Sequence, residues 1–319
     1  MHMVQVQKGE VLAVIPARGG SKSIPRKNIL RFAGHPLLAY SIAAARQSAL
    51  VTRVIVSTDD EEIAAVARKY GAEVPFMRPA EHAQDASPDL PVFEHALAWL
   101  AEHESYHPEL VVHLRPTTPV RPPGCVDEGI QTLFDHPEAD AVRAVVPSGQ
   151  NPFKMWRIED TGVMHNLIPV EGLAEPYNAP RQKLPQTYWQ TGHVDITRPG
   201  TLLEKHSMTG DVILPLVLDP RYTVDIDTQR DWEQAEWLIQ YGDLPVVRPA
   251  EMAYGLPEDL KMVVFDFDGV FTDNRVWVDQ NGVEQVAAHR GDGMGISLLK
   301  KAGVPVYVIS TETNPVVAA

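Results

Sequence analysis

A glycine-containing basic loop follows the first apolar run of the chain. The run at residues 11–15 is long enough for a buried strand, Pro16 ends it, and Gly19 and Gly20 follow among the cations Arg18, Lys22, Arg26 and Lys27. Glycine lets a backbone approach a ligand and turn its N–H groups inward, and cations around such groups bind polyanions, usually phosphates. From charge alone, a solvated surface loop explains these residues equally well.

The charge distribution around this loop favours a negative ligand. The 319-residue chain has a formal net charge of −14, yet positions 11–58 contain no Asp or Glu. The same window contains seven basic residues: Arg18, Lys22, Arg26, Lys27, Arg31, Arg46 and Arg53. An acidic chain that keeps acids out of one region is expected to bind an anion there. Its overall negative charge excludes general nucleic-acid binding.

Two acids near position 226 have the spacing of a metal site. Asp225 and Asp227 lie two apart in the extended stretch YTVDIDTQRDW, so both side chains point to one face. Two such carboxylates repel each other unless a cation joins them, and Mg²⁺ prefers oxygen ligands together with substrate phosphates. Solvated acids at a strand-end turn would give the same spacing, so the pattern alone leaves both interpretations open.

Strands alternate with helices along the chain in the manner of parallel βαβ units. Apolar runs predict strands at residues 11–15, 53–58, 73–76, 110–114, 141–146 and 212–218. Helical spacing predicts helices at residues 36–48, 61–70, 90–103, 123–134 and 229–241, with Asp60 and Thr228 as N-caps. Ligands of such sheets bind beyond the carboxyl ends of the strands, which is where the basic loop begins.

The composition is that of a globular protein with two domains. Hydrophobic residues make up 44% of the chain, and the single cysteine, Cys125, excludes an internal disulfide and fits a reducing compartment. No apolar run of about 20 residues is present, and the N-terminus lacks the apolar core of a signal peptide. We therefore expect a cytoplasmic protein that does not bind membranes.

The loop sequence IPARGGSKSIPRKN, residues 15–28, resembles the signature loop of the acylneuraminate cytidylyltransferases (CMP-sialic acid synthetases). It matches neither the P-loop nor the dinucleotide fingerprint. The resemblance extends over about residues 11–240. It implies a Rossmann-like α/β fold with a mixed, mainly parallel sheet of the nucleotide-diphospho-sugar transferase type. The implied activity is the transfer of CMP from CTP to a nonulosonic acid, with release of pyrophosphate and with Mg²⁺ or, as the alternative, Mn²⁺ as cofactor.

The resemblance also implies where the nucleotide and the metal bind. Arg18, Lys27 and Asp225 are the implied catalytic residues, and Asp225 and Asp227 the implied metal ligands. The implied nucleotide contacts are Ala17, Arg18, Gly19, Ser21, Lys22, Lys27, Asn28, Arg78, Ser87 and Arg115. Arg115 opens the segment RPTTP, where the family often has a glutamine that is implied to touch the cytosine. An arginine can donate to the base carbonyl but cannot accept from the exocyclic amine.

Residues 147–196 resemble the substrate and dimerisation region of the family, which implies a homodimer. The implied contacts to the acidic nine-carbon sugar are Lys154, Arg181, Gln190 and Thr191. Family members commonly have Arg-Pro-Asn-Gly where this chain has Trp189 to Gly192, so Thr191 replaces the sugar-side asparagine. The sequence therefore does not decide which acid is the substrate: sialic acid, its deaminated relative, legionaminic acid or another nonulosonic acid.

A second domain is expected after the first. We place the cytidylyltransferase domain at residues 1–241 and a proline-containing linker at 242–260. The segment DFDGVFTDN and the later HRGDGMGISLLKKAG in residues 261–319 resemble the haloacid dehalogenase (HAD) phosphatases of the octulosonate-phosphate branch. That resemblance implies Asp266 as nucleophile, Asp268 as acid/base, Asp292 near the substrate and Ser310 as a phosphate-binding hydroxyl. These roughly 60 residues are too few for a full core of this type, so we expect no phosphatase activity from them alone.

Three other functions compete with the synthetase. A synthetase of the same fold could use a 3-deoxyoctulosonate instead of a nonulosonate. The chain could be a nonulosonate 9-phosphate phosphatase, when full length, whose first domain only binds nucleotide. It could also be a non-catalytic nucleotide-binding subunit, against which the loop cations and the acid pair argue. The synthetase interpretation requires the basic loop and the acid pair to share one cleft.

Overall fold

The computed structural model describes residues 9–21, 23–84, 87–250, 261–267, 270, 277–278, 280–281, 284–285, 296–297, 299–301 and 303–309. The chain divides into two compact units, Met1–Ala250 and Glu251–Ala319. No helix in the described ranges combines the length and the apolar character needed to cross a membrane.

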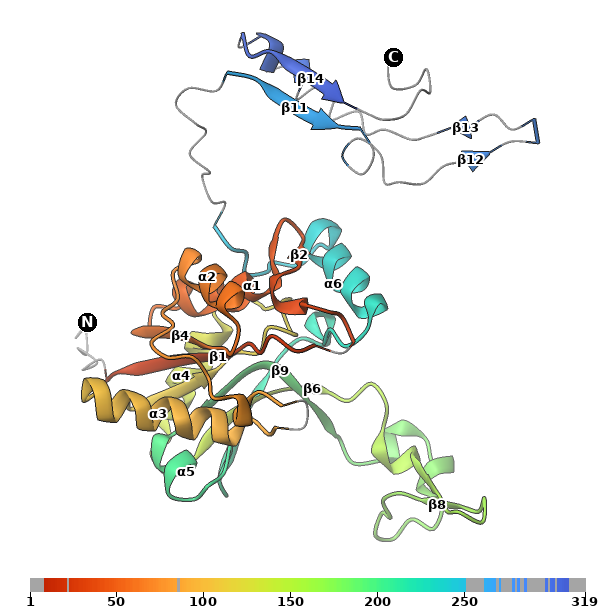
Figure 1. Ribbon diagram of the computed structural model, residues 1–319. Coiled ribbons are helices and arrows are strands. Elements are labelled where there is room, and N and C mark those ends of the chain that lie inside the picture. The colour runs from red at the N-terminus through yellow and green to blue at the C-terminus, as the bar shows by residue number, and fades with distance from the viewer. Residues whose placement is uncertain are drawn as a thin grey trace, which may run out of the picture. The chain divides into compact units, whose positions relative to one another are not determined.

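A six-stranded mixed sheet forms the centre of the first unit, in the order β10-β6-β9-β5-β1-β4 (Figure 1). The strands are β1 (Val11–Pro16), β4 (Arg53–Ser57), β5 (Leu110–His113), β6 (Ala141–Pro147), β9 (Tyr188–Thr197) and β10 (Ile213–Val217). β1 pairs in parallel with β4 and β5, and β6 with β10, whereas β9 is antiparallel to both of its neighbours. The predicted mixed, mainly parallel sheet is confirmed.

Helices cover both faces of this sheet. They are α1 (Leu37–Gln47), α2 (Glu61–Lys69), α3 (Leu90–Glu104), α4 (Cys125–Asp135), α5 (Pro199–Leu203) and α6 (Gln229–Tyr241). Successive side chains of a strand point to opposite faces, so β1 contributes Val11, Ala13 and Ile15 to a core with α1, α2 and α4. Leu12 and Val14 face a second core with α3 and α5. The continuous apolar run of β1 is thus explained by burial on both sides.

A third apolar cluster fixes the late acidic segment beside the early basic loop. Val224 and Ile226 share this cluster with Ile24 and with Trp232 of α6. The short hairpin of β2 (Arg31–Phe32) and β3 (His35–Pro36) belongs to it, because Phe32 meets Trp232 edge to face at 5.1 Å. The predicted cap of α6 is confirmed, since Thr228 forms a capping box with Asp231. The two segments predicted to carry the chemistry are therefore held together by apolar packing.

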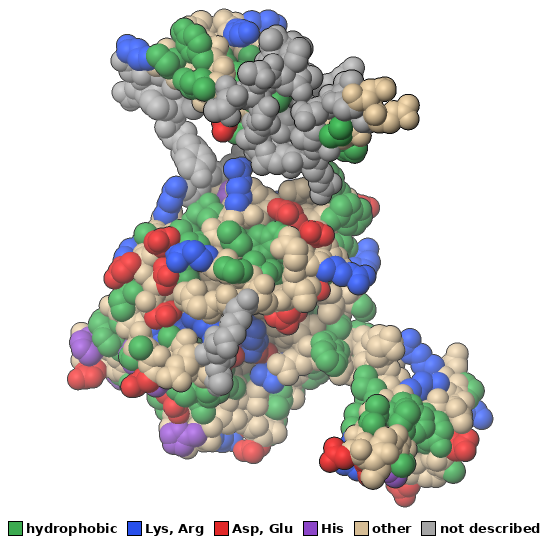
Figure 2. Space-filling model, turned by 45° about the vertical axis from the view of Figure 1, so that its right-hand side comes forward, with side chains coloured by type: hydrophobic (Ala, Val, Ile, Leu, Met, Phe, Trp, Pro, Cys, Tyr) green, Lys and Arg blue, Asp and Glu red, His purple; other side chains and the backbone are tan. Residues whose placement is uncertain are grey.

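Between β6 and β9 the chain forms an excursion with little regular structure. It contains the hairpin of β7 (Trp156–Ile158) and β8 (Met164–Asn166) and three 3₁₀ turns, Pro152–Lys154, Pro176–Asn178 and Arg181–Lys183. Figure 2 shows hydrophobic side chains gathered on its surface. Ile158, Val163, Met164, Leu167 and Ile168 are among the exposed apolar residues of the excursion.

The second unit contains two short sheets in its described residues. β11 (Val263–Asp266) and β14 (Val306–Ile309) pair in parallel, and β12 (Trp277–Val278) pairs with β13 (Glu284–Gln285) in the antiparallel sense. Both parallel strands lie in apolar runs of the sequence, at residues 262–267 and 306–309.

One predicted strand is wrong. Residues 73–76 form isolated bridges and no strand: Glu73 bridges to Ile55, and Met77 to Thr58. Glu73 still exchanges backbone hydrogen bonds with the edge strand β4, at 2.9 Å in each direction. Pro75 has no N–H to continue this ladder, so the pairing stays short.

Candidate functional site: a basic cleft at the carboxyl ends of the strands

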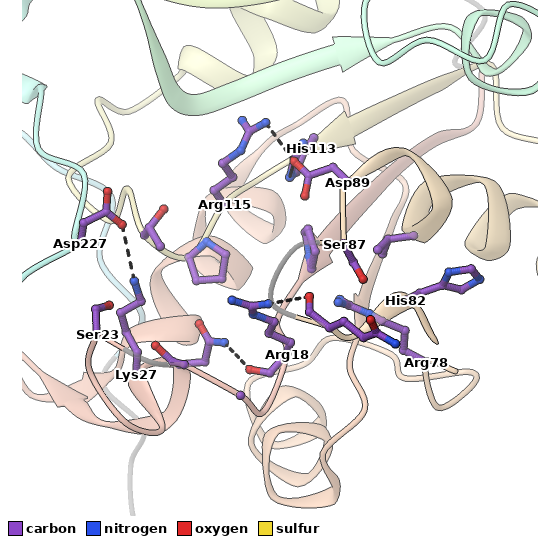
Figure 3. A pocket seen from close by; sticks show the side chains of 18 residues that line it. Arg18, Ser23, Lys27, Arg78, His82, Ser87, Asp89, His113, Arg115 and Asp227 are labelled. Carbon is purple, nitrogen blue, oxygen red and sulfur yellow. Dashed lines mark hydrogen bonds and ion pairs between the residues drawn. The ribbon is translucent and has the colours of Figure 1, made fainter. Parts of the chain in front are cut away.

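A cleft of about 460 Å³ opens where β1 and β5 end (Figure 3). Its lining comes from the basic loop, the loop that precedes α3, the segment after β5 and the late acidic segment. The lining residues are Pro16, Arg18, Gly20, Ser21, Ser23, Lys27, Asn28, Arg78, His82, Gln84, Ser87, Asp89, Val92, His113, Arg115, Pro116, Thr117 and Asp227. The position agrees with the rule that α/β sheets bind ligands at this edge.

The basic loop shares this cleft with Asp227, whereas Asp225, the other acid of the predicted pair, lies outside the lining. The Lys27 ammonium lies 4.0 Å from a carboxylate oxygen of Asp227 and donates to the carbonyl oxygen of Ile226 at 2.6 Å. Lys27 and Ile226 are 199 residues apart in the sequence. Along residues 224–227 the burial alternates, with Val224 and Ile226 inside and Asp225 and Asp227 exposed. Both acids therefore stand on the solvent side of this extended segment, as the spacing predicts.

The cations of the loop have different surroundings. Arg18 and Lys27 line the cleft. Arg26 lies outside the lining and pairs with Glu62 at 2.8 Å and with Asp60 at 3.4 Å. Lys22 lies outside the described residues. Arg18 and Lys27 are therefore the described loop cations that can reach a ligand in the cleft.

Close contacts to the start of α2 hold the loop in place. The Gly19 N–H donates to Asp59 at 2.9 Å, and a Cβ at Gly19 would come within 2.9 Å of an Asp60 carboxylate oxygen. Asp60 accepts from the backbone N–H groups of Glu62 and Ile63, which confirms it as the N-cap of α2. Asn28 closes the loop by donating from its side chain to the Arg18 carbonyl at 3.0 Å. Gly19 is thus needed for a close backbone approach.

Burial shifts the pKa values of Lys27 and Asp225, and neighbouring charges modify both shifts. Burial lowers the pKa of Lys27, while Asp227 and Asp225 partly restore it. Desolvation raises the pKa of Asp225, and the Asp227 charge adds to this, whereas a hydrogen bond with Thr117 and the charge of Lys27 oppose it. Burial therefore disfavours the charged form of both groups, and a nearby opposite charge would stabilise the charged form of each.

The acid pair fits a hard divalent cation. Carboxylate oxygens are the donors that Mg²⁺ prefers, and Mg²⁺ uses one or two of them together with substrate phosphates. Within the described ranges no group of three or more His, Cys, Asp or Glu side chains could hold a metal. Two carboxylates near Lys27 match coordination of Mg²⁺ in which substrate phosphates complete the ligand set.

Arg78 forms the wall of the cleft next to β4. It is buried, donates to the Ser57 hydroxyl at 3.1 Å and also bonds the Ser57 carbonyl. Burial lowers its pKa to about 10. Ser87 lies at the lining and donates to the Glu81 carbonyl at 3.2 Å, while Arg18 donates to the Gln84 carbonyl at 2.7 Å. The predicted nucleotide contacts Arg78 and Ser87 thus lie in the cleft with Arg18.

Arg115 lies in the cleft between two acids. Its guanidinium bonds Asp195 at 2.8 Å and Asp89 at 3.4 Å. Burial opposes its charge, but the Asp195 and Asp89 carboxylates outweigh this and raise its pKa. Asp195 also pairs with Arg143 at 3.1 Å, and Arg143 donates to Gln190 at 3.0 Å.

The predicted sugar contacts do not line the cleft. Lys154 ends a 3₁₀ turn in the excursion, and Arg181 donates to the Ser148 carbonyl at 2.7 Å. Gln190 accepts from Arg143, and the buried Thr191 donates to the Ala144 carbonyl at 3.3 Å. Their role toward the sugar stays a prediction.

Two of the predicted nucleotide contacts also lie outside the lining. Ala17 is buried and its N–H donates to the Ser57 carbonyl at 3.0 Å, while Gly19 faces α2. Sequence reasoning missed six polar or charged residues of the cleft: Ser23, His82, Gln84, Asp89, His113 and Thr117. The position of His113 at the end of β5, next to Arg115, was the available signal.

Of the predicted phosphatase residues, the structure describes one. Asp266 is the last residue of β11 and accepts from the N–H of Phe267 at 2.8 Å. Asp268, Asp292 and Ser310 lie outside the described residues. The phosphatase-like assignment stays a prediction.

Comparison with known proteins identifies the family. A family model described as "Cytidylyltransferase" matches residues 12–160. N-acylneuraminate cytidylyltransferase A of Danio rerio is 31% identical over 97% of this chain and 67% of its own length. CMP-N,N'-diacetyllegionaminic acid synthase of Campylobacter jejuni is 33% identical over 74% of this chain and 97% of its own length. The structure of a CMP:2-keto-3-deoxy-manno-octonic acid synthetase complexed with CTP shares the fold, at a TM-score of 0.53 and 17% identity over 72% of this chain and 98% of its own. The chain therefore belongs to the cytidylyltransferase family that includes the N-acylneuraminate cytidylyltransferases.

Proposed function

We propose that this cytidylyltransferase activates a nonulosonic acid by transferring CMP to it from CTP, with release of pyrophosphate. The observation that carries the proposal is the 4.0 Å approach of Lys27 to Asp227 at one cleft. A cationic loop alone would bind many anions, and an acid pair alone would bind many cations. Their meeting at one site suits a nucleoside triphosphate, whose phosphates need both kinds of partner.

The loop supplies the charge for the triphosphate. CTP carries about four negative charges, so an attacking hydroxyl meets repulsion that the protein must offset. Catalysis of phosphoryl transfer therefore consists mainly of positioning the reactants and stabilising charge. Lys27 and Arg18 provide fixed positive charge, and the backbone at Gly20 and Ser21 lines the same wall. The acceptor hydroxyl attacks the α-phosphorus, and the bond from that phosphorus to the pyrophosphate oxygen breaks.

Asp225 and Asp227 are the residues that would hold the divalent cation, which we propose is Mg²⁺. When bound, such an ion neutralises phosphate charge and lowers the pKa of a coordinated hydroxyl. Lys27 lies beside Asp227 and donates to the backbone between the two acids, so it holds this segment against the basic loop. The basic loop and the acidic segment therefore hold each other in place before the substrate binds.

The acidic sugar is proposed to enter from the side of strand β9. A Cβ at Gly192 would come within 3.2 Å of the Arg115 side chain, so the segment with Gln190 and Thr191 borders the cleft through Gly192. We further propose that two copies pair through the excursion between β6 and β9, because its exposed Ile158, Met164 and Leu167 would bury apolar surface on pairing.

The proposal is tested by pyrophosphate release with CTP, Mg²⁺ and a panel of acceptors. The panel contains sialic acid, its deaminated relative, a legionaminic acid and a 3-deoxyoctulosonate. We expect release with at least one nine-carbon acid and none without Mg²⁺. Release with the octulosonate alone would make the chain an octulosonate synthetase, and no release with any acceptor would contradict the proposal.

A further inference from the structure

The cleft contains a second acid whose position the phosphates do not explain. Figure 3 shows Lys27 and Asp227 on one side, Asp89 and His82 on the other, and Arg18 and Arg115 between them. Asp89 and Asp227 are the two acids in the described lining of the cleft. Asp89 lies on the side of the cleft away from Lys27, where it is available to a part of the ligand other than the phosphates. A carboxylate is a poor neighbour for phosphate and a good one for a donor group on a base.

Asp89 is placed to cap α3 but does not do so. Aspartate is among the preferred N-cap residues because its side chain can accept from the first free N–H groups of the helix. Asp89 occupies the N-cap position of α3, with a helical backbone (φ −68°, ψ −35°) and no side-chain cap bond. Its carboxylate instead meets the Arg115 guanidinium at 3.4 Å, and its side chain is 42% exposed. The Asp89 side chain therefore does not stabilise the start of α3, and it lines the cleft instead.

A buried histidine beside Asp89 has unused hydrogen-bonding capacity. His113 is 2% exposed and lines the cleft, and neither ring nitrogen has a hydrogen-bond partner. Its Nε2 lies 4.0 Å from the Asp89 carboxylate, and its ring packs against Phe93 at 4.6 Å. Burial lowers the pKa of His113 well below its ordinary value, and the Arg115 charge acts in the same direction, so the ring is neutral. Unpaired buried polar atoms are rare and call for a partner.

The arrangement of these groups is complementary to one pyrimidine edge. Cytosine presents an amino donor next to two acceptors, whereas uracil presents an acceptor, a donor and an acceptor. Asp89 offers an acceptor directly beside the donors of Arg115, and Arg115 is held from behind by Asp195 at 2.8 Å. An arginine alone cannot accept from the cytosine amine. Its partner Asp89 supplies the missing acceptor.

We infer that Asp89 and Arg115 together read the edge of the cytosine base, with Asp89 accepting from the exocyclic amine and Arg115 donating to the ring acceptors. This inference rests on the proposed function, since it assumes that the nucleotide is CTP. It assigns the choice of CTP over UTP to one carboxylate. Uracil would place a carbonyl oxygen against Asp89 and an N–H against Arg115, so both contacts would be lost together.

The test compares CTP with one nucleotide that lacks only the 4-amine and with UTP, which carries an oxygen at position 4 and a hydrogen on N3. Binding of CTP, UTP and the pyrimidin-2-one ribonucleoside triphosphate, which lacks the amine, is measured by calorimetry with Mg²⁺ on the whole chain. A hydrogen bond to a charged group predicts that the wild type binds CTP roughly 10- to 100-fold more tightly than the pyrimidin-2-one nucleotide. Asp89→Asn should lower the CTP:UTP affinity ratio at least about tenfold, because the amide can also donate to uracil. Glu81→Gln, which neutralises an exposed acid of the same loop outside the lining, is the matched control and should keep the wild-type ratio.

The outcomes separate this inference from the function on which it rests. Equal binding of CTP and the pyrimidin-2-one nucleotide by the wild type would overturn the inference without requiring any variant. An Asp89→Asn protein with the wild-type CTP:UTP ratio would also overturn it, even if its overall affinity fell. A wild type that binds none of the three nucleotides would remove the proposed function as well.

Discussion

Replacement of Lys27 by methionine tests the chemistry of the cleft most directly. The change keeps the length of the side chain and removes its charge. Lys27 is 8% exposed, so its ammonium acts in a site with little water. At an effective dielectric constant of about 20, two unit charges about 4 Å apart attract each other by about 4 kcal/mol, which equals about a thousandfold in rate. Screening in an open cleft reduces this, and we expect kcat/KM to fall about 10²- to 10³-fold.

A neighbouring cation provides the matched control. Arg26 belongs to the same loop but is paired with Glu62 and Asp60 outside the cleft lining. Arg26→Met removes one exposed charge and should leave kcat/KM within about threefold of wild type, since exposed ion pairs contribute little. The assay is pyrophosphate release with CTP under saturating Mg²⁺. A Lys27→Met enzyme within tenfold of wild type, or an equal loss in Arg26→Met, would refute the assignment of Lys27.

The pH dependence of the same rate gives a second readout. Because burial lowers the pKa of Lys27 from 10.5, the cation is lost as pH rises through that lowered value. The wild-type kcat/KM should therefore decline at a lower alkaline pH than an exposed lysine would produce. Lys27→Arg keeps the charge at every accessible pH, so in its residual activity the alkaline decline should disappear. An unchanged decline in Lys27→Arg would assign it to another group.

Three further predictions concern the metal, the pH stability and the assembly. Asp227→Asn should lower the rate about 10²- to 10³-fold and raise the Mg²⁺ concentration for half-maximal rate, whereas Asp219→Asn, outside the cleft, should change neither; equal Mg²⁺ curves would contradict this. Burial lowers the pKa of His193 from 6.5 to about 4, so the unfolded chain binds more protons between these values, and the stability present above pH 6.5 is lost as pH falls toward 4. The loss of stability approaches about 3 kcal/mol at 1.36 kcal/mol per pH unit. The unfolding free energy of His193→Gln, measured by urea unfolding at several pH values, should therefore depend less steeply on pH than that of the wild type. An equally steep pH dependence in both proteins would exclude His193 as its cause. Ile158→Lys, at a side chain 68% exposed in the excursion, should shift the mass in light scattering from dimer to monomer, whereas Trp237→Lys on α6 should not; a wild-type monomer would end the dimer proposal.

Most of the fold could be predicted from periodicity and capping residues. The apolar run of β1 is continuous because the strand is buried on both faces, and Asp60 and Thr228 cap the helices that follow them. Strand β9 was missed because its first three residues, Tyr188 to Gln190, are exposed and polar or aromatic, and only Thr191 to Thr197 enter the sheet interior. Without the antiparallel β9, the sequence does not reveal that Asp195 lies behind Arg115.

The site could be predicted where one short segment carries the chemistry. Arg18 and Lys27 were found because the loop is contiguous, but its cations looked equivalent, and only the fold turns Arg26 toward Glu62. Asp89 stands directly before the predicted helix at residues 90–103, where a helix cap alone would explain an aspartate. Its role depends on Arg115, which reaches it from the end of another strand, and pairings between distant segments leave no local pattern.

A buried cation in its wall makes the cleft suited to a polyanion before any ligand arrives. Arg78 lines the cleft, whereas the fully buried Arg121 lies outside the lining, donates to the carbonyl oxygen of His193 at 2.7 Å and bonds the carbonyl of Arg115. Within the described residues neither forms an ion pair, and burial lowers the pKa of each to about 10. An uncompensated buried charge destabilises the fold that contains it. A triphosphate bound in the cleft would compensate the charge of Arg78, which lines it. The unfavourable free energy of burying this charge in the empty protein would then be offset on binding, so the stability of the first unit should rise with nucleotide concentration.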